Sequence, residues 1–303
     1  MASPCQLSSD CVQSQFKVSG FIAFQNMKLY RTTKGVFVEH ESRFYFVYAG
    51  ASPDVWDMLV SDPGLPALTQ DAIRTGAATK VDPSTFLAPI GNQEVWAAGV
   101  TYYRSRTARM EESKEAGGGS FYDRVYEAER PELFFKATGR RVVGPGRPVR
   151  IRSDAKWSVP EPELTLLVNP AGAIVGCTIG NDMSSRDIEG ENPLYLPQAK
   201  VYDGSCALGP CVLLTSEPSR NAAIGVEILR NGQKVFAESI TLAELKREPK
   251  ELVSFLYRDN SFPQGAFLMT GTGIIPADDF TLQHGDVIRI AIDGIGVLEN
   301  PVA

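Results

Sequence analysis

The chain has 303 residues, of which 43% are hydrophobic and 22% are charged, and its formal net charge is -6. This composition is typical of a globular protein with one large domain, or with a catalytic domain and a smaller companion. The acidic balance and the lack of a long basic run exclude nucleic acid and anionic membrane surfaces as partners, and no apolar run approaches the roughly 20 residues that span a bilayer.

The first part of the chain predicts a small α+β unit. Three segments within residues 27–48 are rich in aromatic and β-branched residues, which indicates strands. Helical patterns follow over residues 55–62 and 71–77. The opening residues, 1–15, are polar and lack the apolar core of a signal peptide, so we expect a cytoplasmic protein.

Residues 81–93 carry two prolines and several turn residues, as a linker does. We therefore expect a small N-terminal domain over residues 1–85 and a catalytic domain over residues 86–303. No G-x-G-x-x-G motif follows a strand and no G-x-x-x-x-G-K-[ST] motif occurs, so neither a dinucleotide nor a P-loop site is predicted, and no organic cofactor is expected.

The middle of the chain alternates apolar and charged runs. Residues 94–103 predict a strand, and residues 104–116 predict a charged helix. Gly117–Gly119 follow, and they fit a lid hinge and an ordinary surface loop equally well. An aromatic strand is expected over residues 130–139, and it carries Glu132.

Two glutamates mark the predicted strand over residues 157–169. Glu161 and Glu163 alternate along it, so their carboxylates share one face, roughly 6–7 Å apart. If the turn at residues 169–172 closes a tight hairpin, Asp182 returns diagonally opposite Glu161 on that face. Three such carboxylates repel one another unless a cation lies between them. Hard oxygen ligands suit Mg²⁺, and also Mn²⁺ or Ca²⁺.

The alternative to a metal site is that these glutamates are a solvated acidic strand end without a ligand. The downstream Asp182, Lys200 and the Gly/Ser-rich loop after it favour the metal site over that alternative. Asn231 and Gly232 predict a second hairpin, and residues 242–257 predict one amphipathic helix. Many strands of irregular length with few helices indicate an α+β fold built on a mixed, mostly antiparallel rolled β-sheet.

Cysteines and histidines exclude several kinds of site. The five cysteines are odd in number and include no C-x-x-C pair, so we expect reduced thiols, with Cys177 buried in a strand. The chain has only two histidines, which argues against a His-ligated zinc site. His284 lies in a predicted turn as a structural residue, and His40 is expected to face solvent.

Taken in order, several segments resemble the fumarylacetoacetate hydrolase superfamily over roughly residues 91–302. They are GVTYY, the E-x-E of Glu161 and Glu163, GNDMSSRD with Asp182, QAKVYDGSCALGP with Lys200, TGTGIIP, and HGDVIRIAIDGIGVLEN. The resemblance implies a β-roll catalytic domain and a divalent metal held by Glu161, Glu163 and Asp182. It also implies small 2-oxo acid or acylpyruvate substrates and a homodimer or homotetramer.

One segment departs from the hydrolytic members of that superfamily. Those members carry a His in a G-x-N-Y-x-x-H segment and pair it with a Glu to activate water. Here Ser105 stands at the place of the His, and Ala108 stands at the spacing of the Glu. Glu111 and Glu112 lie one turn further on, without a His. A serine without a base is a poor activator of water, so we expect the hydrolytic machinery to be absent.

Residues 99–113 and 129–136 resemble the 2-keto-3-deoxy-D-arabinonate dehydratase branch of the superfamily. The resemblance implies that Glu132 takes part in catalysis together with Lys200 and the metal. The substrate would be a five-carbon 2-keto-3-deoxy acid, and the product would be 2,5-dioxopentanoate. Lys200 would take the C3 proton, or alternatively grip the carboxylate, while Glu132 would protonate the departing C4 hydroxyl.

Other polar residues are candidate substrate contacts. Arg104 offers a guanidinium suited to a carboxylate, although it is equally consistent with a surface position. Ser105, Thr272 and Ser184 offer hydroxyl groups. Ser184 and the two residues after it follow Asp182 closely and could instead fix its carboxylate.

Two other functions stay open at this stage. The first is an acylpyruvate-type C–C hydrolase or an oxaloacetate decarboxylase of the same superfamily, with Glu132 or Glu111 replacing the missing dyad. The second is a protein that binds the metal but has no turnover.

Overall fold

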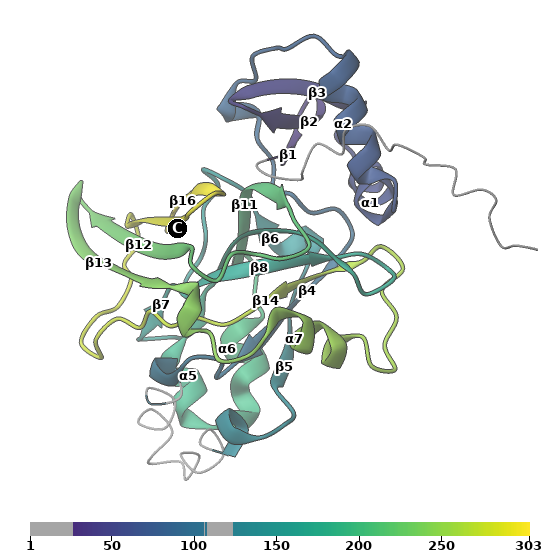
Figure 1. The fold of residues 1–303 in the computed structure, drawn as a ribbon. Helices are drawn as coiled ribbons and strands as arrows, with labels where there is room; N and C mark the ends of the chain where they lie inside the picture. Colours follow the sequence, from purple (N-terminus) through teal and green to yellow (C-terminus); the bar gives the residue numbers. More distant parts are fainter. Residues whose placement is uncertain (1–26, 106, 108–123) are drawn as a thin grey trace, which may run out of the picture.

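The computed structural model describes residues 27–105, 107 and 124–303, and within them three β-sheets form the framework (Figure 1). The largest sheet has ten strands in the order β3-β2-β1-β11-β9-β8-β14-β4-β5, with β6 beside β11. A second sheet has the order β13-β12-β15-β16, and β10 pairs with β7. All strand pairs are antiparallel except β14 with β4 and β6 with β11. The expected α+β fold with mostly antiparallel sheets is confirmed.

The strands have the following bounds: β1 Lys28–Thr32, β2 Gly35–His40, β3 Arg43–Ala49, β4 Glu94–Gly99, β5 Glu132–Thr138, β6 Val142–Val143, β7 Ser158–Val159, β8 Pro162–Val168, β9 Ile174–Asp182, β10 Ser184–Ser185, β11 Cys206–Leu214, β12 Ala223–Arg230, β13 Gln233–Thr241, β14 Ala266–Met269, β15 Val287–Ile292 and β16 Gly296–Pro301. The α-helices are α1 Pro53–Ser61, α2 Leu65–Thr75, α5 Arg186–Glu191, α6 Leu196–Lys200 and α7 Pro249–Leu256. Short 3-10 turns are η1 Pro83–Thr85, η2 Gly139–Arg141, η3 Pro193–Tyr195 and η4 Leu242–Glu244. Among the described residues, none of the helices combines the length and the apolar character needed to cross a bilayer.

The N-terminal strands extend the main sheet, because β1 pairs with β11. Helices α1 and α2 lie beside them (Figure 1). Helix α1 begins where Ser52 accepts a hydrogen bond from the Val55 N–H and Pro53 occupies the first turn. The division expected near residue 85 stays a prediction.

The main sheet is covered on both faces, which is why every residue of β8 is buried. Leu164 and Leu166 of β8 belong to an apolar cluster that also contains Ile224 and Ile290 of the second sheet. Leu167 points to the opposite face and belongs to a second cluster, which includes residues of the N-terminal strands and helices. Alternation along the strand places Glu163 on the same face as Leu167.

The β8–β9 hairpin contains a bulge that sets the register of its open end. Leu167 pairs with Gly176 but Val168 pairs with Ile174, so Val175 is an extra residue in β9. Beyond the bulge Pro162 pairs with Asn181, and the Asp182 N–H donates to the Glu161 carbonyl at 3.0 Å. Asp182 therefore lies directly opposite Glu161. The expectation of a diagonal position was wrong, because a tight turn without the bulge gives a different register.

The single helix predicted over residues 242–257 was also wrong. The structure has η4 at its start and α7 from Pro249, and Glu248 between them is extended, with φ -73 and ψ 137. Proline has no N–H to donate and disfavours the helical conformation of the residue before it, so the pattern breaks at Pro249. Most of the charged helix predicted over residues 104–116, and the hinge or loop at Gly117–Gly119, lie outside the described residues.

We expect Asn169→Ala to lower the free energy of unfolding by about 1–3 kcal/mol, because it leaves two N–H groups of the hairpin turn without their acceptor. The Asn169 side-chain Oδ1 accepts from the N–H groups of Ala171 and Ala173, both at 3.0 Å. Urea unfolding followed by circular dichroism measures the change. The control is Asn169→Asp, which keeps an acceptor oxygen and should lose much less. Equal stability of the alanine variant and the wild type would contradict this role.

Candidate active site

Three carboxylates converge at the open end of the β8–β9 hairpin. Glu161 precedes β8, Glu163 lies in β8 and Asp182 ends β9. One carboxylate oxygen from each lies within 4.8 Å of the other two. The three residues are at most 5% exposed. The structure thus brings together Glu161 and Glu163, predicted from the alternation, and Asp182, predicted from the hairpin. Their role as metal ligands stays a prediction.

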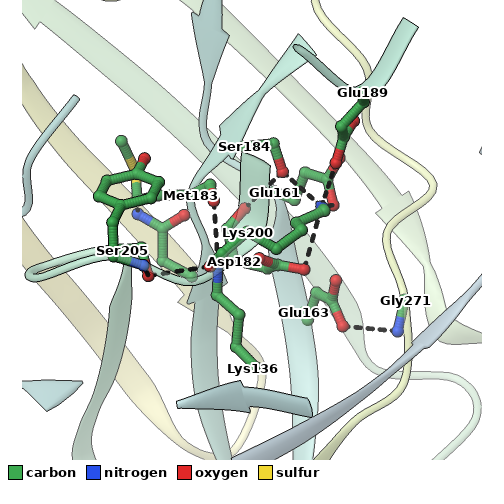
Figure 2. Close-up of polar contacts among 12 residues, drawn as sticks. Lys136, Glu161, Glu163, Asp182, Met183, Ser184, Glu189, Lys200, Ser205 and Gly271 are labelled. Carbon is green, nitrogen blue, oxygen red and sulfur yellow. Dashed lines mark hydrogen bonds and ion pairs between the residues drawn. The ribbon is translucent and has the colours of Figure 1, made fainter. Parts of the chain in front are cut away.

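Lys200 contacts two carboxylates of this triad (Figure 2). It ends α6, is fully buried, and places Nζ 2.7 Å from Glu161 Oε2 and 3.1 Å from Asp182 Oδ2. Nζ also donates to Ser184 Oγ. The Phe134 ring of β5 has its centroid 5.7 Å from Nζ. A buried ammonium held by two carboxylates partly offsets their mutual repulsion.

Two further cations hold the other oxygens of the same carboxylates. Arg186 of α5 donates to Glu161 Oε1 at 2.8 Å. Lys136 of β5 forms an ion pair with Asp182 Oδ1 and donates to the carbonyl oxygens of Lys200, at 2.6 Å, and Met183, at 3.0 Å. The bond from Arg186 goes to Glu161, whereas the sequence suggested Asp182 as the carboxylate that this residue fixes.

Glu163 has a different electrostatic environment. Its Oε2 accepts the Gly271 N–H at 2.6 Å. Burial raises the pKa of Glu163 well above its ordinary value, and the charges of Asp182 and Glu161 raise it further. Gly271 has φ +92, and a Cβ there would collide with the Thr101 hydroxyl. Glycine at this position therefore allows the backbone N–H to reach Glu163.

A small cavity opens onto these groups, with a volume of about 20 Å³. This is enough for one water molecule or one bare metal ion. Its lining consists of the carboxylate triad, two of the cations, and residues of the strand ends and loops around them: Ala98, Gly99, Val100, Ser105, Phe134, Glu161, Glu163, Asp182, Arg186, Lys200, Gly271 and Thr272. Three buried carboxylates provide negatively charged oxygen ligands, which suit a hard divalent cation such as Mg²⁺.

Four other candidate residues have distinct positions. Ser105 lines the cavity, and its hydroxyl donates to the Tyr102 carbonyl at 2.8 Å. Thr272 also lines it, and its hydroxyl accepts the Ile274 N–H at 3.2 Å. Ser184 is buried behind Lys200 and donates to the Asp182 carbonyl at 3.1 Å. The Arg104 side chain is 46% exposed and pairs with Glu238 of β13, outside the cavity lining.

Glu132 lies beside the cavity. It starts β5 directly opposite Gly99 of β4. A Cβ built on Gly99 would collide with Glu132 Oε2, so the carboxylate lies against the backbone of a residue that lines the cavity. The structure therefore places Glu132 next to the triad's cavity but not among the residues of its lining. Ala108, Glu111 and Glu112 lie outside the described residues.

Sequence reasoning gave no role to Lys136, Glu189 or Gly271. Glu189 of α5 is 2% exposed and places Oε1 3.2 Å from Lys200 Nζ. A lysine in the apolar run LFFKAT is an unusual core residue, and that signal could have indicated Lys136. Neither Glu189 nor Gly271 carries a comparable local signal, because their partners come from distant parts of the chain.

The comparisons with known proteins agree with this geometry. The family model described as fumarylacetoacetate (FAA) hydrolase C-terminal matches residues 100–303. A probable 2-keto-3-deoxyxylonate dehydratase of Haloferax volcanii is 48% identical over 216 residues, which cover 71% of this chain and 73% of the relative. A 2-dehydro-3-deoxy-D-arabinonate dehydratase of Saccharolobus solfataricus is 44% identical over 218 residues, which cover 71% of this chain and 73% of the relative.

A solved structure extends the similarity to the fold. It is 2-keto-3-deoxy-D-arabinonate dehydratase complexed with magnesium and 2,5-dioxopentanoate, with a TM-score of 0.76 and 33% identity. The alignment covers 91% of this chain and 98% of that one. The chain belongs to the fumarylacetoacetate hydrolase family.

We expect Glu163→Gln to weaken Mg²⁺ binding by about tenfold or more, because it removes one of the triad's carboxylates. In wild type, Mg²⁺ affinity should fall as the pH is lowered, since the raised pKa of Glu163 means that it takes up a proton early. Isothermal titration calorimetry at several pH values measures both effects. The exposed Glu191→Gln is the control, and unchanged Mg²⁺ affinity in Glu163→Gln would remove this residue from the site.

The same substitution tests the electrostatics without metal. A carboxyl group whose pKa is raised by folding costs stability as the pH rises through that pKa, and it costs nothing below the pKa of the unfolded chain. In EDTA, Glu163→Gln should therefore unfold at a higher temperature than wild type at about pH 8, and the difference should shrink towards about pH 4.

Proposed function

We propose that this protein is a metal-dependent hydro-lyase that dehydrates a 2-keto-3-deoxy-pentonate to 2,5-dioxopentanoate. The single observation that carries the proposal is the buried contact of Lys200 with two carboxylates of the triad at 2.7 and 3.1 Å. A candidate base thus lies directly beside a candidate metal site. The similarity to dehydratases at 44% and 48% identity supports the same reaction class.

Glu161, Glu163 and Asp182 would hold the divalent ion, with Mg²⁺ favoured and Mn²⁺ or Ca²⁺ also suited to the oxygen ligands. When bound, the ion supplies Lewis-acid polarisation of the C2 ketone of a 2-oxo acid and stabilises negative charge on its oxygen. Arg186 and Lys136 hold the triad in shape, because each bonds a carboxylate oxygen. This fixed arrangement costs little reorganisation during the reaction.

Lys200 would take the proton from C3. Lys200 belongs to the cavity lining, and its Nζ lies beside Ser184 Oγ and two carboxylates of the triad. A divalent ion bound by those carboxylates would disfavour the ammonium form of Lys200, and the neutral amine would then accept the proton. In the competing role, Lys200 stays an ammonium ion and binds the substrate carboxylate. Exchange of the C3 hydrogen with solvent deuterium separates the two roles, since only a base catalyses the exchange.

Glu132 would donate a proton to the C4 hydroxyl as it leaves. Its carboxylate lies against Gly99, a residue of the cavity lining. Water leaves as a product, and the unsaturated 5-hydroxy-2-oxo acid that remains tautomerises to 2,5-dioxopentanoate by loss of a proton from C5 and gain of one at C3, after which the resulting enol gives the aldehyde. The reaction therefore needs no activated water nucleophile. Ser105 at the edge of the cavity therefore suffices where hydrolytic relatives would need a histidine, and neither His40 nor His284 lines the cavity.

We also infer a cytoplasmic location and a homodimeric or homotetrameric assembly. The location is supported by Cys177, Cys206 and Cys211, which are buried free thiols. The assembly rests on the family resemblance, and light scattering of the purified protein tests it. Arg104, Ser105, Thr272 and Ser184 stay proposed substrate contacts, and of these Ser105 and Thr272 line the cavity.

Purified protein with Mg²⁺ should convert 2-keto-3-deoxy-pentonate to 2,5-dioxopentanoate, followed with a coupled aldehyde dehydrogenase. Lys200→Ala should lower turnover by about 10²–10⁴-fold and abolish C3 exchange, because it removes the base. The exposed Lys250→Ala is the control. Release of pyruvate from an acylpyruvate, without turnover of the sugar acid, would overturn the dehydratase proposal in favour of a hydrolase.

Gly99→Ala should lower kcat by about 10²-fold while Mg²⁺ affinity stays close to wild type, because the new methyl displaces only the end of the Glu132 side chain. Gly225→Ala in β12, where a Cβ makes ordinary contacts, is the matched control. Steady-state kinetics and calorimetry measure the two quantities. A Gly99→Ala enzyme with wild-type kcat would exclude Glu132 as the acid.

A further inference from the structure

Glu189 is a buried acid that the proposed mechanism does not use. It lies in α5, is 2% exposed, and is absent from the residues that line the cavity. Its Oε1 is 3.2 Å from Lys200 Nζ, and its Oε2 is 3.9 Å from Arg186 Nε. Figure 2 shows its carboxylate directed at Lys200 from the side away from Glu163. One carboxylate thus pairs closely with Lys200 and lies at the longer distance of an ion pair from Arg186.

These contacts belong to a closed ring of alternating charge. Lys200 contacts Glu161, Glu161 accepts from Arg186, and Arg186 faces Glu189, which returns to Lys200. Every member is buried. Charge alternation around such a ring keeps each cation beside two acids, which offsets the desolvation of the charges.

A bound divalent ion would compete with Lys200 for some of the carboxylates around it but not for others. Glu161 and Asp182, which contact Lys200, belong to the triad that would hold the ion. Their oxygens would then be shared between the ion and Lys200, and two cations would compete for the same carboxylates. Glu189 lies outside the triad, so its contact with Lys200 does not depend on that competition.

We propose that Glu189 is a positioning residue that holds Nζ of Lys200 and the guanidinium of Arg186 at the cavity wall while the triad binds a divalent ion. The expected loss of kcat rests on the proposed function, whereas the expected movement of Lys200 in a crystal structure does not. A carboxylate is needed because its negative charge lies beside both cations, 3.2 Å from Lys200 Nζ and 3.9 Å from Arg186 Nε. A glutamine presents one acceptor, and its NH₂ group would face the other cation.

Two variants separate this role from a merely structural one. Glu189→Gln keeps the shape but can satisfy only one of the cations. Glu189→Asp keeps both acceptors on a shorter side chain and should recover part of the function. Glu191→Gln, at an exposed acid two residues later in α5, is the matched control and should behave as wild type.

The first experiment is the crystal structure of the Mg²⁺-bound wild type and of Mg²⁺-bound Glu189→Gln. We expect Lys200 Nζ to keep its contact with Glu189 in wild type and to move away from the cavity wall in the variant. An unmoved Lys200 in the variant, or a wild-type Lys200 that leaves Glu189 when Mg²⁺ binds, would overturn the inference. This readout is independent of the substrate.

The second experiment measures kcat, KM and C3 exchange on the 2-keto-3-deoxy-pentonate. Glu189→Gln should lower kcat and the exchange rate together by about 10²-fold, with KM and the Mg²⁺ dissociation constant near wild type, and Glu189→Asp should restore part of both rates. Wild-type kcat in Glu189→Gln, or a loss that comes only from weaker Mg²⁺ binding, would contradict positioning. If the wild type itself does not turn over, the proposed dehydratase function fails, and the crystal structures alone then decide the role of Glu189.

Discussion

The structure depends on burying acids and bases together at the open end of one hairpin. Four buried carboxylates, from Glu161, Glu163, Asp182 and Glu189, meet three buried cations, from Lys136, Arg186 and Lys200. An unpaired charge at such depth costs several kcal/mol, so each group requires its partners. The excess of acid over base concentrates at Glu163, which accepts a backbone N–H and whose pKa is raised by burial and by the neighbouring carboxylates. A divalent cation held by the triad would place positive charge beside Glu163, which is why the site suits metal chemistry.

These charged groups come from the β8–β9 hairpin and from one strand and two helices outside it. Strands β8 and β9, with the residue just before β8, supply the triad. Strand β5 supplies Lys136 and Glu132, and α5 and α6 supply Arg186, Glu189 and Lys200. The helices are short, and the ion pairs join them to the sheet. The chemistry that the site supports follows from this arrangement, because the candidate base and the candidate metal ligands are in direct contact. A reaction that removes a proton and releases water needs both and requires no histidine.

Local sequence was enough to predict much of this. The i, i+2 spacing of Glu161 and Glu163 places both on one face of a strand, because successive side chains of a strand point to opposite faces. Turn residues at 169–172 predicted the hairpin, and the β-branched and aromatic segments predicted most strands. The predicted hairpin brought Asp182 to the two glutamates, and the order of the family motifs added support for Asp182 and for Lys200. The helix predicted over residues 242–257 fails at Pro249, because a proline interrupts the helix that the hydrophobic spacing indicates.

Tertiary structure alone decided how these residues meet. The extra residue Val175 shifts the register by one and so turns Asp182 to the face of Glu161, since a shift of one residue reverses every side chain beyond it. The contacts of Lys136 with Asp182, of Gly271 with Glu163 and of Glu132 with Gly99 join segments 33 to 108 residues apart. No local pattern specifies such contacts, because they arise only when separate strands and helices pack. The sequence by itself therefore determined which chemical groups the protein has, and packing determined which of them act together.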